Sequence, residues 1–144
     1  MLYDNKLWTP GDFLKNLPPT LPTLSKNEFI KVNFANSKIE NCIIKNINDE
    51  IISNNNKKFI RILIDILKTM DIEQISQKTS FCIKLYKYTL EGYVWYPDLN
   101  LSIQYKDACS TLKEIIKLVD INNFLIYIKI KLATGDVIQY GKKI

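Results

Sequence analysis

The segment from Lys57 to Met70 carries apolar side chains around most of a helix, and it limits what the rest of the chain can be. Its main stripe recurs at three- and four-residue spacing and contains Phe59, Leu63, Ile66, Leu67 and Met70. A further set widens the stripe: Ile60, Ile62 and Ile64. A helix this apolar must be buried on more than one side. The spacing therefore predicts a buried helix over 57–70, to which 71–78 are expected to add a further turn.

A second amphipathic segment covers residues 110–119. Its apolar stripe contains Ala108, Leu112, Ile115, Ile116 and Val119, and Asp107 or Ser110 can cap its start. Each helix needs an apolar wall, and an antiparallel sheet with both helices on one face supplies it.

Segments of alternating polarity provide the strands of that sheet. Phe29–Phe34 alternates and is followed by a turn at 35–38, so we expect it to form a hairpin with Ile39–Ile47, although the latter fits a helix face nearly as well. Residues 80–105 predict a three-stranded meander that turns at Glu91-Gly92, and 124–132 pairs with 137–140 around Thr134-Gly135. The expected fold is α+β: a mainly antiparallel sheet, two principal helices on one face, and a single domain over 25–144.

Residues 1–24 are organised differently. Thr9-Pro10-Gly11-Asp12 is typical of a helix start, and the proline-rich run over 18–22 favours an extended path. We expect a short helix and a Pro-rich arm, which either packs along the domain or docks on a partner.

The composition is that of an ordinary globular domain. No apolar run is long enough to cross a bilayer, and no secretory signal pattern opens the chain. Cys42, Cys82 and Cys109 are widely spaced, as is typical of free thiols. We therefore expect a cytoplasmic protein without membrane contact. The net charge of +5 comes from lysines, since Arg61 is the only arginine. The abundance of Lys, Ile and Asn points to an AT-rich genome, which is viral, phage or bacterial.

The chain lacks the residues of the common catalytic sites. It has no histidine, which excludes Ser-His-Asp and Cys-His sites and His-ligated zinc, and its four glycines form no phosphate-binding loop. The close acid pairs Asp49/Glu50 and Asp71/Glu73 lie near predicted element ends, where caps and solvated surface are the usual role. No catalytic, cofactor or metal residue is nominated, so we expect a protein that is not an enzyme.

A set of aromatic and lysine side chains is the candidate binding surface. Strand alternation places Lys84, Tyr86 and Tyr88 on one face, and Tyr93 and Trp95 join them if the register allows. Three residues of the 124–132 strand share that face if it belongs to the same sheet: Tyr127, Lys129 and Lys131. These rings either form an exposed contact surface or pack beneath a helix or the N-terminal arm.

Residues 81–119 resemble the core of HicB-type antitoxins. The likeness rests on the order of five features. These are a strand, the run Glu91-Gly92-Tyr93-Val94, the run Pro97-Asp98-Leu99, a second strand, and the helix Ser110–Val119. It implies a decayed RNase H fold that binds a small RNase toxin. It covers about a quarter of the chain, and Asn100-Leu101 stands where that family usually has glycine. Any β-β-β-α segment produces this pattern, so the chain is not assigned to the family.

Two functions remain open. The first is a non-enzymatic protein-binding module: an accessory, immunity or antitoxin-like factor, or a small subunit of a larger, possibly viral, assembly. The alternative is a nucleic-acid-binding or ribosome-associated protein that uses the lysine and aromatic face. The partner's identity and the oligomeric state stay open.

Overall fold

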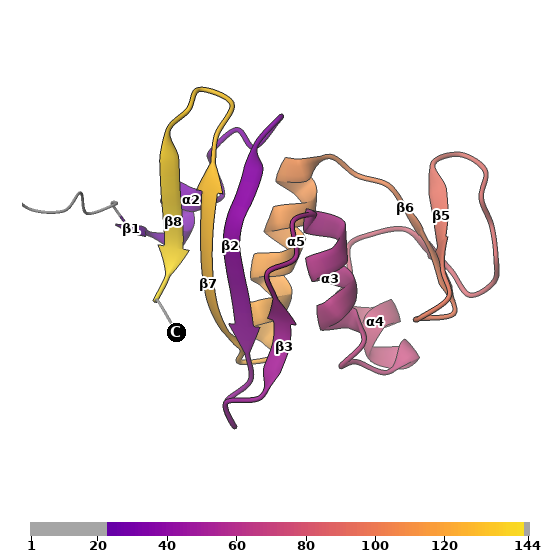
Figure 1. Cartoon of the computed structure of the whole chain (residues 1–144). Helices are drawn as coiled ribbons and strands as arrows, with labels where there is room; N and C mark the ends of the chain where they lie inside the picture. Colours follow the sequence, from indigo (N-terminus) through magenta and orange to yellow (C-terminus); the bar gives the residue numbers. More distant parts are fainter. Residues whose placement is uncertain (1–22, 143–144) are drawn as a thin grey trace, which may run out of the picture.

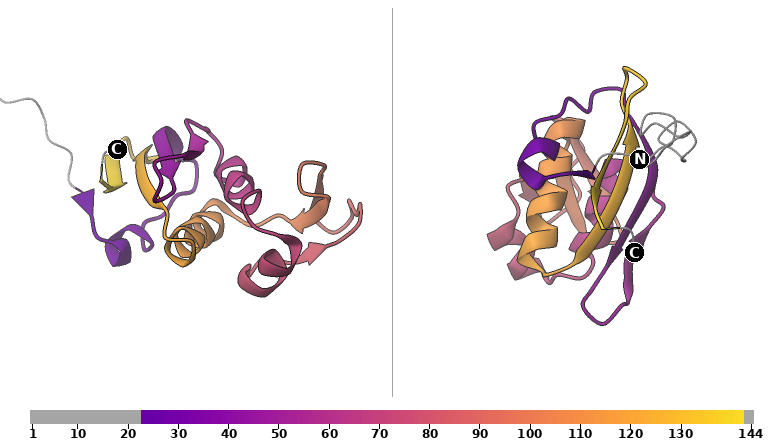
Figure 2. Two further views of the ribbon diagram at one scale, coloured as in Figure 1. Left: turned by 90° about the horizontal axis from the view of Figure 1, so that it is seen from below. Right: turned by 90° about the vertical axis from the view of Figure 1, so that its left-hand side faces the viewer.

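The computed structural model describes residues 23–142, and over this range the predicted α+β class is confirmed. The predicted helix start at Thr9–Asp12 and the Pro-rich arm over 18–22 lie outside the described residues. The strands do not form the single sheet that we expected, because they are divided between two sheets. Figure 2 (left) shows these sheets at opposite ends of the molecule, with helices between them.

The larger sheet has five strands. Their order across the sheet is β1 (Thr23–Leu24), β8 (Val137–Gly141), β7 (Leu125–Lys131), β2 (Lys38–Lys45) and β3 (Ile51–Asn54). All neighbours are antiparallel except β1 and β8, which are parallel. The predicted hairpin around Thr134-Gly135 is confirmed, and the ambiguous 39–47 segment is a strand.

The smaller sheet has three strands in the order β4 (Ile83–Lys84), β6 (Leu101–Gln104) and β5 (Tyr93–Tyr96). A meander over 80–105 was expected, but β6 lies in the centre and pairs with both of the others. The predicted strand over 81–89 is wrong beyond Lys84. After that residue the backbone is hydrogen-bonded to the side chain of Ser102 rather than to a neighbouring strand.

The two predicted helices are present as α3 (Phe59–Leu67) and α5 (Ala108–Ile121), which pack against each other. Figure 1 shows α5 crossing behind the larger sheet, and α3 contacts β3. Asp107 caps α5 by accepting the Ser110 N–H at 2.7 Å. Both helices contribute to one core with the two sheets, and its fully buried side chains include Leu63, Ile66, Leu112, Ile115, Ile128 and Ile103.

The segment over 71–78 is a separate helix, α4 (Ile72–Lys78), and not a further turn of α3. Asp71 and Gln74 form a capping box, in which Asp71 accepts the Gln74 N–H at 2.8 Å and Gln74 accepts the Asp71 N–H at 3.1 Å. A new N-cap needs extended backbone at Asp71, so α3 cannot continue through it.

The expected strand over 29–34 is wrong. A short helix, α2 (Lys26–Phe29), is held by a capping box between Ser25 and Glu28. Phe29 and Phe34 are both buried, but they meet edge to face with ring centroids 5.2 Å apart and do not alternate along a strand. The hairpin partner of β2 is therefore β3, a strand that the alternation pattern did not reveal.

Candidate binding surface

Four predicted side chains meet on the smaller sheet: Lys84, Tyr86, Tyr88 and Tyr93, here called the Tyr–Lys cluster. The Lys84 ammonium lies 5.1 Å from the Tyr88 ring centroid and 5.4 Å from that of Tyr93. It lies 6.0 Å from the Tyr86 ring. The rings contact one another edge to face, with centroids 6.2 Å apart for Tyr86–Tyr88 and 5.2 Å for Tyr88–Tyr93. These are distances at which a cation is attracted to the face of a ring.

Ser102 holds the backbone beneath this cluster. Its hydroxyl donates to the Tyr86 carbonyl at 2.8 Å and accepts the Tyr88 N–H at 2.8 Å. Ser102 is fully buried although it is polar, because both hydrogen bonds replace water. The segment between β4 and β5 is therefore anchored to the central strand of the sheet, which limits the motion of the tyrosines that it carries.

A turn completes the cluster on its far side. Glu91 and Gly92 both have positive φ, and the Gln104 side-chain amide donates to the Glu91 carbonyl at 3.0 Å. The Tyr88 hydroxyl donates to Glu91 Oε1. That hydrogen bond, with the nearby negative charge, raises the pKa of Tyr88, so its hydroxyl remains protonated at neutral pH.

Lys84 interacts with rings and not with an acid. Among the described residues, no carboxylate lies within ion-pair distance of its ammonium. The positive charge is therefore held by three electron-rich ring faces and is not neutralised. A group that approaches this surface meets both aromatic area and a positive charge.

Trp95 lies on the same face of the sheet, since it pairs with Ser102 from β5 while Lys84 pairs with Ser102 from β4. The two are two strand spacings apart, roughly 10 Å. Trp95 is half-buried and borders the cluster.

The other three predicted residues do not belong to this surface. Tyr127, Lys129 and Lys131 lie on β7 of the larger sheet, at the opposite end of the molecule, because the strands are divided between two sheets. Tyr127 is only 6% exposed, and its hydroxyl donates to Gln139 Oε1 at 2.8 Å. Lys131 is exposed at the end of the strand, where it pairs with Lys38.

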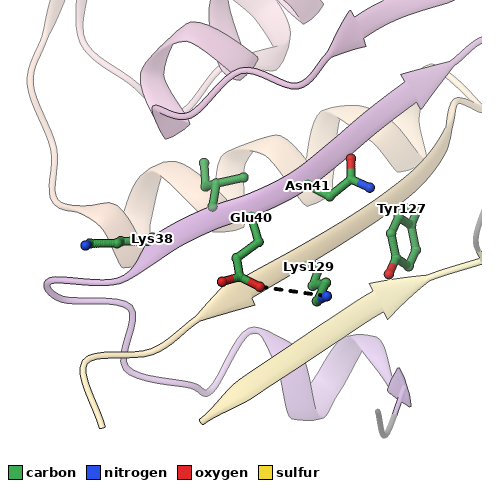
Figure 3. Close-up of a pocket in the computed structure, with 6 residues that line it drawn as sticks. Lys38, Glu40, Asn41, Tyr127 and Lys129 are labelled. Atoms are coloured by element: carbon green, nitrogen blue, oxygen red, sulfur yellow. Dashed lines mark ion pairs between the residues drawn. The ribbon is translucent and has the colours of Figure 1, made fainter. Parts of the chain in front are cut away.

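Tyr127 and Lys129 line a separate, shallow hollow of about 560 Å³ on the larger sheet, with Lys38, Ile39, Glu40 and Asn41. Figure 3 shows Glu40 pointing to Lys129, with 3.8 Å between the carboxylate and the ammonium. This ion pair neutralises Lys129, whereas Lys38 in the same lining has no carboxylate of the described residues within ion-pair distance.

The alternation pattern missed the apolar part of the candidate surface. Strand alternation would place Leu85 opposite Lys84 and Tyr86, on the side of the buried Phe81, yet Leu85 is 59% exposed because the strand ends at Lys84. Leu90, which is 65% exposed, lies in the same stretch of chain. Val94 is 45% exposed but pairs with Ile103, so it faces the other side of the smaller sheet. Only the place where the strand ends decides this exposure, and the sequence carries no clear signal for it.

The close acid pairs have structural or surface positions. Asp71 caps α4, and Asp49 adopts positive φ in the β2–β3 turn and pairs with Lys45 at 3.1 Å. Across residues 23–142, the side chains of His, Cys, Asp and Glu form no group of three that could hold a metal ion. None of the helices within that range has the length and apolar character needed to cross a bilayer.

Comparison with known proteins gave no match to a family model, a curated protein or a solved structure. The resemblance of residues 81–119 to HicB-type antitoxins therefore stays a prediction.

Proposed function

We propose that this chain is a non-enzymatic protein-binding module whose contact surface is the Tyr–Lys cluster with its neighbouring apolar side chains. One observation carries the proposal. Among the ten large hydrophobic side chains that are exposed in the described part of the chain, three fall within residues 85–90, the segment that carries two of the cluster's tyrosines: Leu85, Tyr86 and Leu90. Exposed apolar side chains scattered singly are normal, whereas a concentration of them in one short segment is typical of a contact site.

The chemistry of the cluster favours a protein partner. Tyrosines provide a large contact area at small entropic cost, and these rings are already held by one another and by Ser102. The unpaired charge of Lys84 favours a partner whose apolar surface carries an acidic side chain. An accessory, immunity or antitoxin-like role, or that of a small subunit in a larger and possibly viral assembly, requires such a surface, and we place this role in the cytoplasm.

The test compares two variants of the full chain in affinity capture from the native source. Tyr86→Ala with Leu90→Ser removes exposed side chains of the surface and should reduce recovery of the specific partner at least about tenfold, since two hot-spot side chains contribute about 2 kcal/mol or more. The control, Ile47→Ser with Ile51→Ser, alters side chains of comparable exposure at the β2–β3 hairpin of the larger sheet.

Urea unfolding should show both variants within about 0.5 kcal/mol of the natural chain, as is usual for surface substitutions. Equal recovery of the partner by the Tyr86/Leu90 variant and by the natural chain would refute the proposed surface.

Nucleic-acid binding is the second candidate, because base stacking on tyrosines beside a lysine uses the same chemistry. It predicts binding to single-stranded RNA whose log affinity falls with log salt by about 0.7 for each phosphate contact. No binding near 50 mM salt would eliminate it.

A further inference from the structure

A second hollow, unrelated to the proposed binding surface, lies between α5 and the segment that leads into the smaller sheet. It has a volume of about 230 Å³. Its lining is rich in lysine and serine: Ser80, Phe81, Lys106, Ser110, Lys113, Glu114 and Lys117. Ser110, Lys113 and Lys117 follow one another at spacings of three and four residues, so they lie along one side of α5, and Lys106 comes from the linker before the helix.

The charges in this hollow are unbalanced. Three lysines and one glutamate line it, a formal charge of +2, which Asp107 beside them reduces to +1. Lys117 pairs with Glu114 at 3.0 Å and donates to the Ser80 hydroxyl at 2.7 Å. Within residues 23–142, Lys106 and Lys113 have no carboxylate within ion-pair distance.

The single acid in the lining is already satisfied. Glu114 is buried and accepts hydrogen bonds from Thr79 Oγ1 at 2.7 Å, the Ser80 N–H at 2.9 Å and Ser80 Oγ at 2.8 Å, as well as its ion pair with Lys117. Lys106 lies 5.3 Å above the Phe81 ring, which forms an apolar wall and leaves its ammonium available at the hollow. The unpaired positive charge of the hollow therefore comes from Lys106 and Lys113.

We propose that the hollow lined by Lys106, Ser110 and Lys113 binds a phosphoryl group. Lys113 and Ser110 reach it from α5 and Lys106 from the linker before α5, so donors approach from two directions, whereas the Ser80 N–H and hydroxyl are already bonded to Glu114. A phosphoryl group has three or more oxygens to accept them, whereas a carboxylate has two. Lysine is a common point-charge ligand for phosphate, and no histidine or arginine is needed for this chemistry.

The source of the group is either free inorganic phosphate or a small phosphate ester, and two titrations distinguish them. The ¹⁵N-labelled full chain is titrated with inorganic phosphate and, separately, with ribose 5-phosphate, with sodium chloride at equal ionic strength as the reference. We expect saturable shifts of the Ser80, Ser110 and Lys113 amide signals. If ribose 5-phosphate binds at least tenfold tighter than inorganic phosphate, the source is a phosphate ester. If the two compounds bind with equal affinity, the hollow recognises the phosphoryl group alone.

The double variant K106Q/K113Q is compared with the control K87Q. Lys87 is exposed and does not line the hollow. Each lysine that is lost should lower the affinity about tenfold, the value of one charge-assisted hydrogen bond. K87Q should leave the affinity unchanged. No saturable shift with either phosphate compound, an unaltered affinity of the K106Q/K113Q protein, or an equal loss in K87Q would each overturn the proposal.

Discussion

Replacing Glu114 by glutamine should destabilise the protein more than any other single exchange of an acid for its amide in the described chain. Glu114 is 3% exposed and joins α5 to Thr79 and Ser80, which lead into the smaller sheet. Its carboxylate accepts four contacts, from Thr79 Oγ1, the Ser80 N–H, Ser80 Oγ and the Lys117 ammonium. Glutamine keeps one acceptor oxygen but turns its NH₂ group toward two of those donors.

The cost follows from that count. Hydrogen bonds to a charged group contribute about 1.5–3 kcal/mol each. The loss of two, offset by the smaller cost of burying a neutral amide, lowers the free energy of unfolding by about 2–4 kcal/mol. At roughly 4 °C per kcal/mol for a domain of this size, the melting temperature should fall by about 8–16 °C.

The difference depends on pH in a defined direction. Burial acts to raise the pKa of Glu114, but the hydrogen bonds from Thr79 and Ser80 outweigh it, so the pKa lies below its ordinary value of 4.5. A lowered pKa means that the stabilisation is complete above about pH 4.5 and is lost as the pH falls through the folded-state pKa. The gap between the natural chain and E114Q should therefore be constant from about pH 6 to 8 and shrink in acid.

The assay is urea unfolding of both proteins between pH 3 and 8, with E73Q as the control. Glu73 is exposed in the first turn of α4, so its replacement should cost less than about 0.5–1 kcal/mol. An E114Q protein within 0.5 kcal/mol of the natural chain at pH 7 refutes the reasoning. A gap that persists unchanged at pH 3 refutes it as well.

Three further outcomes follow from the described contacts. Gly141→Ala should lower stability by at least about 2 kcal/mol in thermal unfolding, because Gly141 has positive φ and the added Cβ would collide with the Ile126 carbonyl. Gly135→Ala adds a Cβ in open space and should cost only about 1 kcal/mol. Cys82 is exposed and should react with a thiol reagent in the folded protein, whereas burial raises the pKa of Cys42 to about 12, so Cys42 should react only on unfolding. Ile128→Ala in the central strand β7 should cost about 3–5 kcal/mol in urea unfolding.

Part of the candidate surface could be predicted from alternation alone. Lys84, Tyr86 and Tyr88 do gather on one side, but the side-chain anchor at Ser102 places the tyrosines there, not a continuous strand. The exposure of Leu85 could not be predicted, because alternation assigns a residue to a face only while the strand continues.

The sequence by itself determined the two long helices, the C-terminal hairpin and the α+β class, since each depends on periodicity within one segment. Only the tertiary structure decided that the strands form two sheets, that Phe29 belongs to a short capped helix, and that Tyr127 lies far from Tyr88. Periodicity states which side of a segment is buried but not against which partner. Strand pairing depends on contacts between residues distant in sequence, such as Cys42 with Ile128, and no local pattern encodes that choice.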